Sequence, residues 1–67
     1  MPNQIKSLSK GLRVYRYIVD YYKPIKAVTL CENLGIDKST MSRLLKTLLD
    51  EGFISYLENS NDIILND

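Results

Sequence analysis

The sequence predicts a mainly α-helical domain with three helices and a small β-hairpin, and three observations support this prediction. Apolar residues recur with the helical period in three separate stretches of the chain. Each stretch ends next to Pro24, Gly35 or Gly52, residue types at which a helix commonly stops. After the third stretch, two apolar and branched runs flank a polar turn, which is typical of a hairpin.

The first predicted helix covers residues 8–22 and follows a flexible arm at residues 1–7. Ser7 or Ser9 is suited to cap its start. Pro24 lacks the N–H that a continuing helix needs, so we expect the helix to end at about residue 22. Its apolar face, suited to core or dimer packing, consists of Leu8, Leu12, Tyr15, Val19 and Tyr22, widened by Val14 and Ile18.

A short extended linker at residues 24–26 precedes the second helix, and one of its residues is suited to pair with the later hairpin. The spacing of Ala27, Leu30, Cys31 and Leu34 predicts a two-turn helix over residues 27–34 that ends at Gly35. This helix has no obvious side-chain cap, because Lys26 stands where Ser or Thr would be expected.

The third predicted helix covers residues 38–51 and follows a tight turn at Gly35. Asp37 is a good N-cap, since its carboxylate can accept from the free N–H groups of Ser39 or Thr40. Gly52 is expected to end the helix. One face carries the apolar residues Met41, Leu44, Leu45, Leu48 and Leu49.

The end of the chain predicts a hairpin with strands at residues 53–58 and 62–65. Asn59, Ser60 and Asn61 lie between the strands and favour a turn. Two helices joined by a glycine-containing turn, a further helix packed on them and a hairpin together make a winged helix-turn-helix. We expect residues 1–67 to form this single domain.

The composition excludes several functional classes. The chain has 67 residues, 45% of them hydrophobic, which supports one small core but leaves no room for an ordinary enzyme. It has no histidine and a single cysteine, so we expect no catalytic site, no metal site and no cofactor. No apolar stretch is long enough to span a bilayer or resembles a secretory leader, and we expect a cytoplasmic protein without membrane contact.

The charge is unevenly distributed along the chain. Residues 1–26 carry six basic side chains against one acidic side chain. Residues 47–67 carry five acidic side chains and no basic one. A basic N-terminal region can lie along DNA phosphates while the acidic end stays away from them.

The third helix has a second face of hydroxyls and cations, which suits the DNA major groove. Arg43 is the best candidate for bidentate contact to guanine, and Lys46 is suited to base or phosphate. Ser39 and Thr40, near the helix N-terminus, are suited to phosphate. The predicted DNA-binding residues are Lys38, Ser39, Thr40, Ser42, Arg43, Lys46, Lys10, Asn59, Ser60 and Asn61.

Three segments resemble the N-terminal DNA-binding domain of IclR-type bacterial transcriptional regulators. They are residues 7–12 (SLSKGL), 34–48 (LGIDKSTMSRLLKTL) and 51–54 (EGFI), of which the second is the most specific. The resemblance implies that the third helix contacts operator DNA and that the wing touches an adjacent groove or the backbone. It also implies that full-length members are dimers or tetramers with a C-terminal domain that binds small molecules. We therefore expect an effector only if the natural protein has such a domain.

Two departures from the family pattern affect this interpretation. The wing at residues 58–62 has no Arg or Lys, and Tyr15 and Tyr17 stand where aliphatic residues are common.

One small module buries about 600–1,000 Å² against DNA, so we expect a homodimer on a pseudo-palindromic operator, with the first helix as its interface. The alternative is a winged-helix protein-interaction module without DNA binding, whose acidic C-terminal third contacts the partner.

Overall fold

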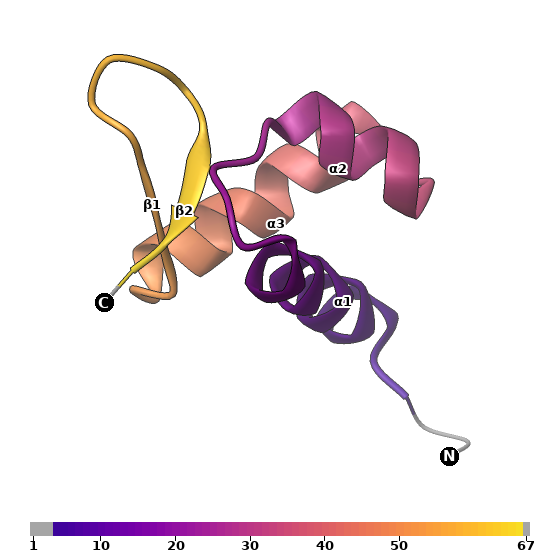
Figure 1. Cartoon of the computed structure of the whole chain (residues 1–67). Coiled ribbons are helices and arrows are strands. Elements are labelled where there is room, and N and C mark those ends of the chain that lie inside the picture. The colour runs from indigo at the N-terminus through magenta and orange to yellow at the C-terminus, as the bar shows by residue number, and fades with distance from the viewer. Residues whose placement is uncertain (1–3, 67) are drawn as a thin grey trace.

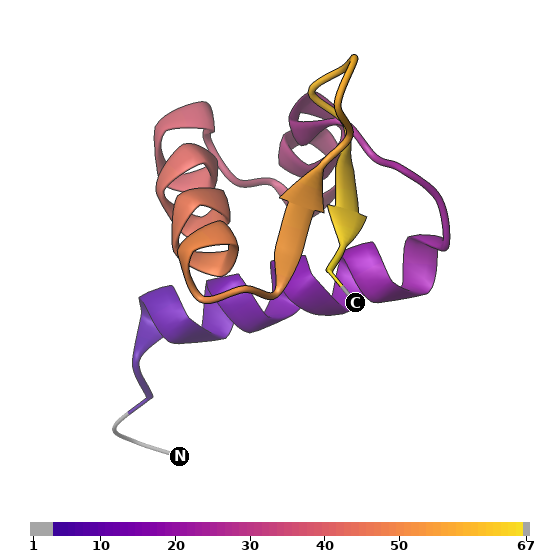
Figure 2. The ribbon, with the colours of Figure 1, turned by 90° about the vertical axis from the view of Figure 1, so that its left-hand side faces the viewer.

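The computed structural model describes residues 4–66 and shows three helices followed by a two-stranded antiparallel hairpin (Figure 1). The elements in chain order are α1 (Lys6–Tyr21), α2 (Ala27–Leu34), α3 (Lys38–Asp50), β1 (Ile54–Tyr56) and β2 (Ile63–Leu65). Figure 2 shows α1 running beneath α3 and the hairpin. The predicted fold class, mainly α with a small hairpin in a winged helix-turn-helix, is confirmed.

The start of α1 differs from the prediction. The helix begins at Lys6, two residues early, and Ile5 occupies the N-cap position without a side-chain cap. Ser7 and Ser9 lie inside the helix, so neither caps it. Of the predicted flexible arm at residues 1–7, the last two residues are therefore helical, and residues 1–3 lie outside the described part of the chain.

The end of α1 agrees with the prediction to within one residue. The helix ends at Tyr21, and Tyr22 adopts the left-handed conformation with φ of 73°. Pro24 follows two residues later and lacks the N–H that a further turn needs. The chain then turns and passes Ile25 alongside the hairpin.

The helix-turn-helix unit forms with the predicted signals. Gly35 ends α2 in the left-handed conformation, with φ of 66°, and its N–H donates to the Cys31 carbonyl at 2.9 Å. Asp37 caps α3, because its carboxylate accepts from the Thr40 N–H at 3.0 Å. The bounds of α2 match the prediction, and α3 ends one residue before the predicted Glu51.

The hairpin strands are shorter than predicted, with three residues each. Phe53 was expected in the first strand, but its N–H donates to the Leu48 carbonyl at 2.9 Å and so belongs to the turn that ends α3. The strands pair from Ile54 opposite Leu65 to Tyr56 opposite Ile63. The expected pairing of the linker with the hairpin is confirmed, since Ile25 and Ile63 exchange two backbone hydrogen bonds of 3.0 and 2.8 Å.

All five elements and the connections between them contribute to one hydrophobic core. Each buried side chain is almost completely removed from solvent. The buried residues are Val14, Ile18, Ile25, Leu30, Ile36, Met41, Leu45, Ile54 and Ile63.

The predicted apolar face of α1 divides into two rows with different surroundings. Val14 and Ile18 are buried, and Tyr15 packs edge-on against Phe53 with ring centroids 5.4 Å apart. In contrast, Leu8 is 57% exposed and Leu12 is 59% exposed. Tyr22 is 94% exposed, so it does not pack in the core, because the left-handed turn at this residue leads the chain away from the helix axis.

No helix among residues 4–66 combines the length and the apolar character needed to cross a membrane.

Candidate nucleic-acid interface

The position of α3 is fixed from its apolar side. Met41 and Leu45 are buried, and Leu44 and Leu48 are partly buried and pack against the core beside them. Leu49, which was predicted on the same face, is half-exposed at its edge. The opposite side of α3 therefore faces away from the core.

We define the outer face of α3 as the residues about half a helical turn away from Met41 and Leu45. On a helix of 3.6 residues per turn these are Ser39, Arg43, Lys46 and Asp50, and all four are exposed. The Arg43 and Ser42 side chains are not covered by other parts of the domain. The face that the sequence predicts for DNA is therefore free.

A shallow groove borders the outer face on the side of α2. Its volume is about 320 Å³, and Lys38 and Ser42 line it from α3. Ala27, Val28 and Cys31 line it from α2, and Tyr56 closes it from β1. The structure thus brings two predicted DNA-binding residues together with the start of α2 and the first strand.

The N-terminus of α3 carries a charged cap. The pKa of Asp37 lies below its usual value, chiefly because the Thr40 N–H donates to its carboxylate, with further lowering by the Thr40 side chain and the charge of Lys10. The cap uses the Thr40 N–H, as the sequence predicts for Asp37, and Thr40 itself is half-buried. Ser39 remains the more accessible hydroxyl at this end of the helix.

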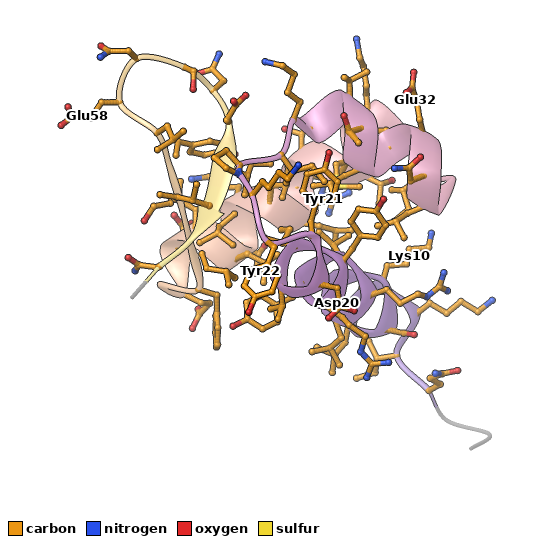
Figure 3. All side chains as sticks on the ribbon, viewed as in Figure 1. Lys10, Asp20, Tyr21, Tyr22, Glu32 and Glu58 are labelled. Carbon is orange, nitrogen blue, oxygen red and sulfur yellow. The ribbon has the colours of Figure 1, made fainter. Side chains whose placement is uncertain are left out.

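Lys10 lies on the same side of the molecule as the start of α3. Its charge acts on Asp37, and Figure 3 shows its side chain on the side of α1 that faces α2. The Lys10 side chain is exposed. Residues far apart in the sequence therefore place positive charge beside the helix that was predicted to contact DNA.

Two ion pairs form among residues 4–66, and each involves a lysine near α3 or α2. The Lys46 ammonium lies 3.4 Å from the Asp50 carboxylate, one turn along the outer face. The Lys26 ammonium lies 3.0 Å from the Asp62 carboxylate, which joins the start of α2 to the wing. Lys26 was not among the predicted site residues. Its position directly before the second helix was a signal for it, but its partner was not evident from the sequence.

The wing residues Asn59, Ser60 and Asn61 are exposed on the hairpin loop and are not brought together with the outer face of α3. Ser60 stabilises the loop, because its hydroxyl accepts from the Asp62 N–H at 3.3 Å. Figure 3 shows Glu58 on the same loop, at a distance from the helices. Turn formation accounts for these side chains, and their contact with DNA stays a prediction.

Comparison with known proteins identifies relatives of this fold and site. The family model of the IclR helix-turn-helix domain matches residues 7–58. The chain is 31% identical over 51 residues to the transcriptional repressor IclR of Escherichia coli (strain K12), which covers 76% of this chain and 19% of the relative. The acetate operon repressor of Salmonella typhimurium is similar with the same identity and coverage.

Two solved structures share the fold. The IclR family transcriptional regulator from Brucella abortus has a TM-score of 0.84 and 25% identity, over 94% of this chain and 24% of that protein. The transcriptional regulator from Alicyclobacillus acidocaldarius has a TM-score of 0.85 and 30% identity, over 97% of this chain and 26% of that protein. The chain thus spans only 19–26% of the length of these relatives. Because the family model covers most of the chain, the protein belongs to the family of IclR helix-turn-helix domains.

Proposed function

We propose that this domain binds double-stranded operator DNA sequence-specifically and regulates bacterial transcription in the cytoplasm. The observation that carries the proposal is the exposed outer face of α3, which is anchored by buried Met41 and Leu45 on the opposite side. A helix held in this way can enter the major groove without rearranging the core. The relatives described above are named as repressors or transcriptional regulators, and repression is the mode we favour.

The residues of α3 have different roles in this proposal. Arg43, in the middle of the outer face, forms two hydrogen bonds to one guanine. Ser39 and Thr40 contact phosphate near the helix N-terminus, where the helix dipole favours negative charge. Lys38, Ser42 and Lys46 lie beside them and contact either bases or phosphate. Lys10 and the wing residues 59–61 add phosphate contacts at the edges of the interface.

The first test separates this function from the alternative, a winged-helix domain that binds only proteins. Fluorescence anisotropy measures binding to a random-sequence duplex of about 30 base pairs as a function of salt. A DNA-binding domain binds at low salt and weakens steeply as salt rises, because binding releases counterions. Absence of salt-dependent binding would overturn the proposal and favour a protein partner for the acidic C-terminal third.

We also propose that the domain binds DNA as a homodimer that is joined through α1. The exposed residues Leu8 and Leu12 border an apolar groove of about 490 Å³ between α1 and α3. Leu44, Leu48 and Phe53 line the groove from the other side. Burial of this surface in a second copy favours association. It would also add a second α3 to contact the other half of a pseudo-palindromic operator.

The dimer proposal is tested with Leu12→Glu. The side chain is exposed, so the charge leaves the fold intact but cannot be buried between two copies without a large desolvation cost. Sedimentation equilibrium should show a loss of self-association. Leu57→Glu, which changes another exposed apolar residue on the wing, should leave self-association unchanged. Equal behaviour of the two variants would contradict an interface on α1.

An effector ligand belongs to this proposal only if the natural protein continues into a larger domain. The relatives are four to five times longer than the matched region, which leaves room in them for other domains. Within residues 4–66 the proposal requires only DNA and a second copy of the chain.

A further inference from the structure

Each of the two ion pairs among residues 4–66 holds a lysine of the helix-turn-helix unit, Lys26 at the start of α2 and Lys46 on α3. Lys46 is on the outer face of α3, and its ammonium lies 3.4 Å from Asp50. Lys26 directly precedes Ala27 and Val28, which line the same groove as Ser42, and its ammonium lies 3.0 Å from Asp62. Both lysine side chains are largely open to solvent, with exposures of 75% and 68%. A phosphate can therefore reach each ammonium only in competition with a carboxylate that is already there.

We propose that Asp50 and Asp62 lower the affinity of this domain for DNA by competing with DNA phosphates for Lys46 and Lys26. This inference rests on the proposed DNA binding. Exposed ion pairs contribute little to folding stability, because water and salt screen them. Their effect on a polyanion is larger, since each paired lysine attracts phosphate less strongly than a free one.

The competition affects every complex in which these lysines contact phosphate. A non-specific complex obtains essentially all of its free energy from contacts between cations and phosphates. A specific complex also obtains free energy from contacts with base edges, which Arg43 provides independently of the two carboxylates. Competition for the two lysines therefore lowers both affinities by a similar factor, and it leaves the weaker non-specific complex with little binding free energy. Under this proposal the acidic residues on this surface limit the affinity for DNA.

The position of each carboxylate supports this role over a purely structural one. Asp50 lies one turn after Lys46 on a helix whose other side is packed in the core, so the helix does not need this pair to form. Asp62 is the less exposed partner of its pair, and its backbone already accepts from the Leu57 N–H at 2.9 Å. The adjacent bridge between Ile25 and Ile63 holds the wing against the start of α2.

The test uses Asp50→Asn and Asp62→Asn, with Asp20→Asn as the matched control. Asp20 is exposed on α1, forms no ion pair among residues 4–66, and lies on the side of α1 away from α2 (Figure 3). All three variants change the net charge equally, so only the position of the charge differs. Anisotropy titrations of a random-sequence duplex and of a duplex selected from a random library by the unchanged protein are compared between about 50 and 300 mM salt.

We expect each of the two variants to bind the random duplex more tightly and with a steeper salt dependence. One additional phosphate contact makes the slope of log affinity against log salt steeper by about 0.9. A tenfold change in salt, from 0.1 M to 1 M, then lowers the affinity by a further factor of about 8. Affinity for the selected duplex should rise by a similar factor, because the same two lysines contact phosphate in both complexes. Asp20→Asn should leave the slope unchanged.

The outcomes separate this inference from the proposed function. If the unchanged protein binds neither duplex, the DNA-binding proposal fails and this inference fails with it. If the unchanged protein binds DNA but Asp50→Asn and Asp62→Asn behave like Asp20→Asn, the competition is wrong and the DNA-binding proposal stands. Thermal unfolding of Asp62→Asn shows whether the wing has loosened, and in that case Asp50→Asn alone decides the result.

Discussion

The two longest helices, α1 and α3, are both amphipathic, but they use their exposed sides differently. In α3 the apolar face is buried around Met41 and Leu45, and the side left outside is polar and partly cationic. In α1 the apolar residues form two rows, and the row with Leu8 and Leu12 remains outside. Helical periodicity predicts that a helix has an apolar and a polar face, but the packing of neighbouring elements determines how much of the apolar face is buried within the domain. The uncovered side suits a different partner in each case, and under the proposed function this is DNA for α3 and an apolar surface for α1.

The largest expected effect compares a buried leucine of α3 with an exposed leucine of α1. Leu45→Ala should lower the free energy of unfolding by about 2–5 kcal/mol, because it leaves a cavity in the core. Leu12→Ala should change it by less than about 0.5 kcal/mol in the monomer, since this side chain is already exposed. Urea unfolding at low protein concentration measures both. Similar losses would mean that Leu12 is packed within the monomer.

Features that depend on neighbouring residues in the sequence were predicted well. Gly35, Asp37 and Pro24 act on their own turns, so the bounds of α2 and the start of α3 were predictable. The residues on the outer face of α3 were predictable as well, because the helical period places them opposite Met41 and Leu45. These predictions needed no knowledge of the tertiary arrangement.

Most features that depend on distant residues were not predicted, although the pairing of the linker with the hairpin was. The pair between Lys26 and Asp62 joins positions 36 residues apart, and no local pattern indicates it. The exposure of Leu8 and Leu12 depends on how α3 packs on α1, which the spacing of apolar residues does not determine. The predicted start of the first strand was one residue early for a more local reason, because the Phe53 N–H donates to the Leu48 carbonyl at the end of α3.

The next largest effect tests the polar side of α3 directly. Arg43→Ala should leave stability nearly unchanged, since the side chain is exposed, but should remove about 1–3 kcal/mol of discrimination at one base position per half-site. Binding to duplexes that differ at single positions measures this. Arg16→Ala removes the same charge from the exposed surface of α1 and should weaken all duplexes equally. Unchanged base preference in Arg43→Ala would show that another residue contacts the base.

A smaller effect is expected where α1 contributes to the DNA side. Lys10→Ala should weaken binding to all sequences and reduce the salt slope by about 1, because Lys10 lies near the start of α3 and is suited to phosphate. Lys23→Ala, an equivalent change beyond the end of α1, should reduce the slope less. If both variants have the same slope, the basic N-terminal region attracts DNA only through its total charge. In that case the proposed dimer contact would be the only binding role left for α1.

The smallest effect concerns how the two helices begin, since Asp37 caps α3 and α1 starts at Ile5 without a side-chain cap. The pKa of Asp37 in the folded state lies below its ordinary value of 3.8, chiefly because the Thr40 N–H donates to the ionised carboxylate. A carboxylate whose pKa is lowered by folding stabilises the fold above its unfolded pKa, and this contribution disappears as the pH falls through the folded pKa.

Asp37→Asn keeps a side chain that can cap the helix and removes only the charge. The midpoint of thermal unfolding should therefore be higher for the unchanged protein than for Asp37→Asn near neutral pH, and the two should converge in acid below the folded pKa. Asp20→Asn on α1 should show no such convergence, and a gap for Asp37→Asn that widens in acid would contradict a charged cap on α3.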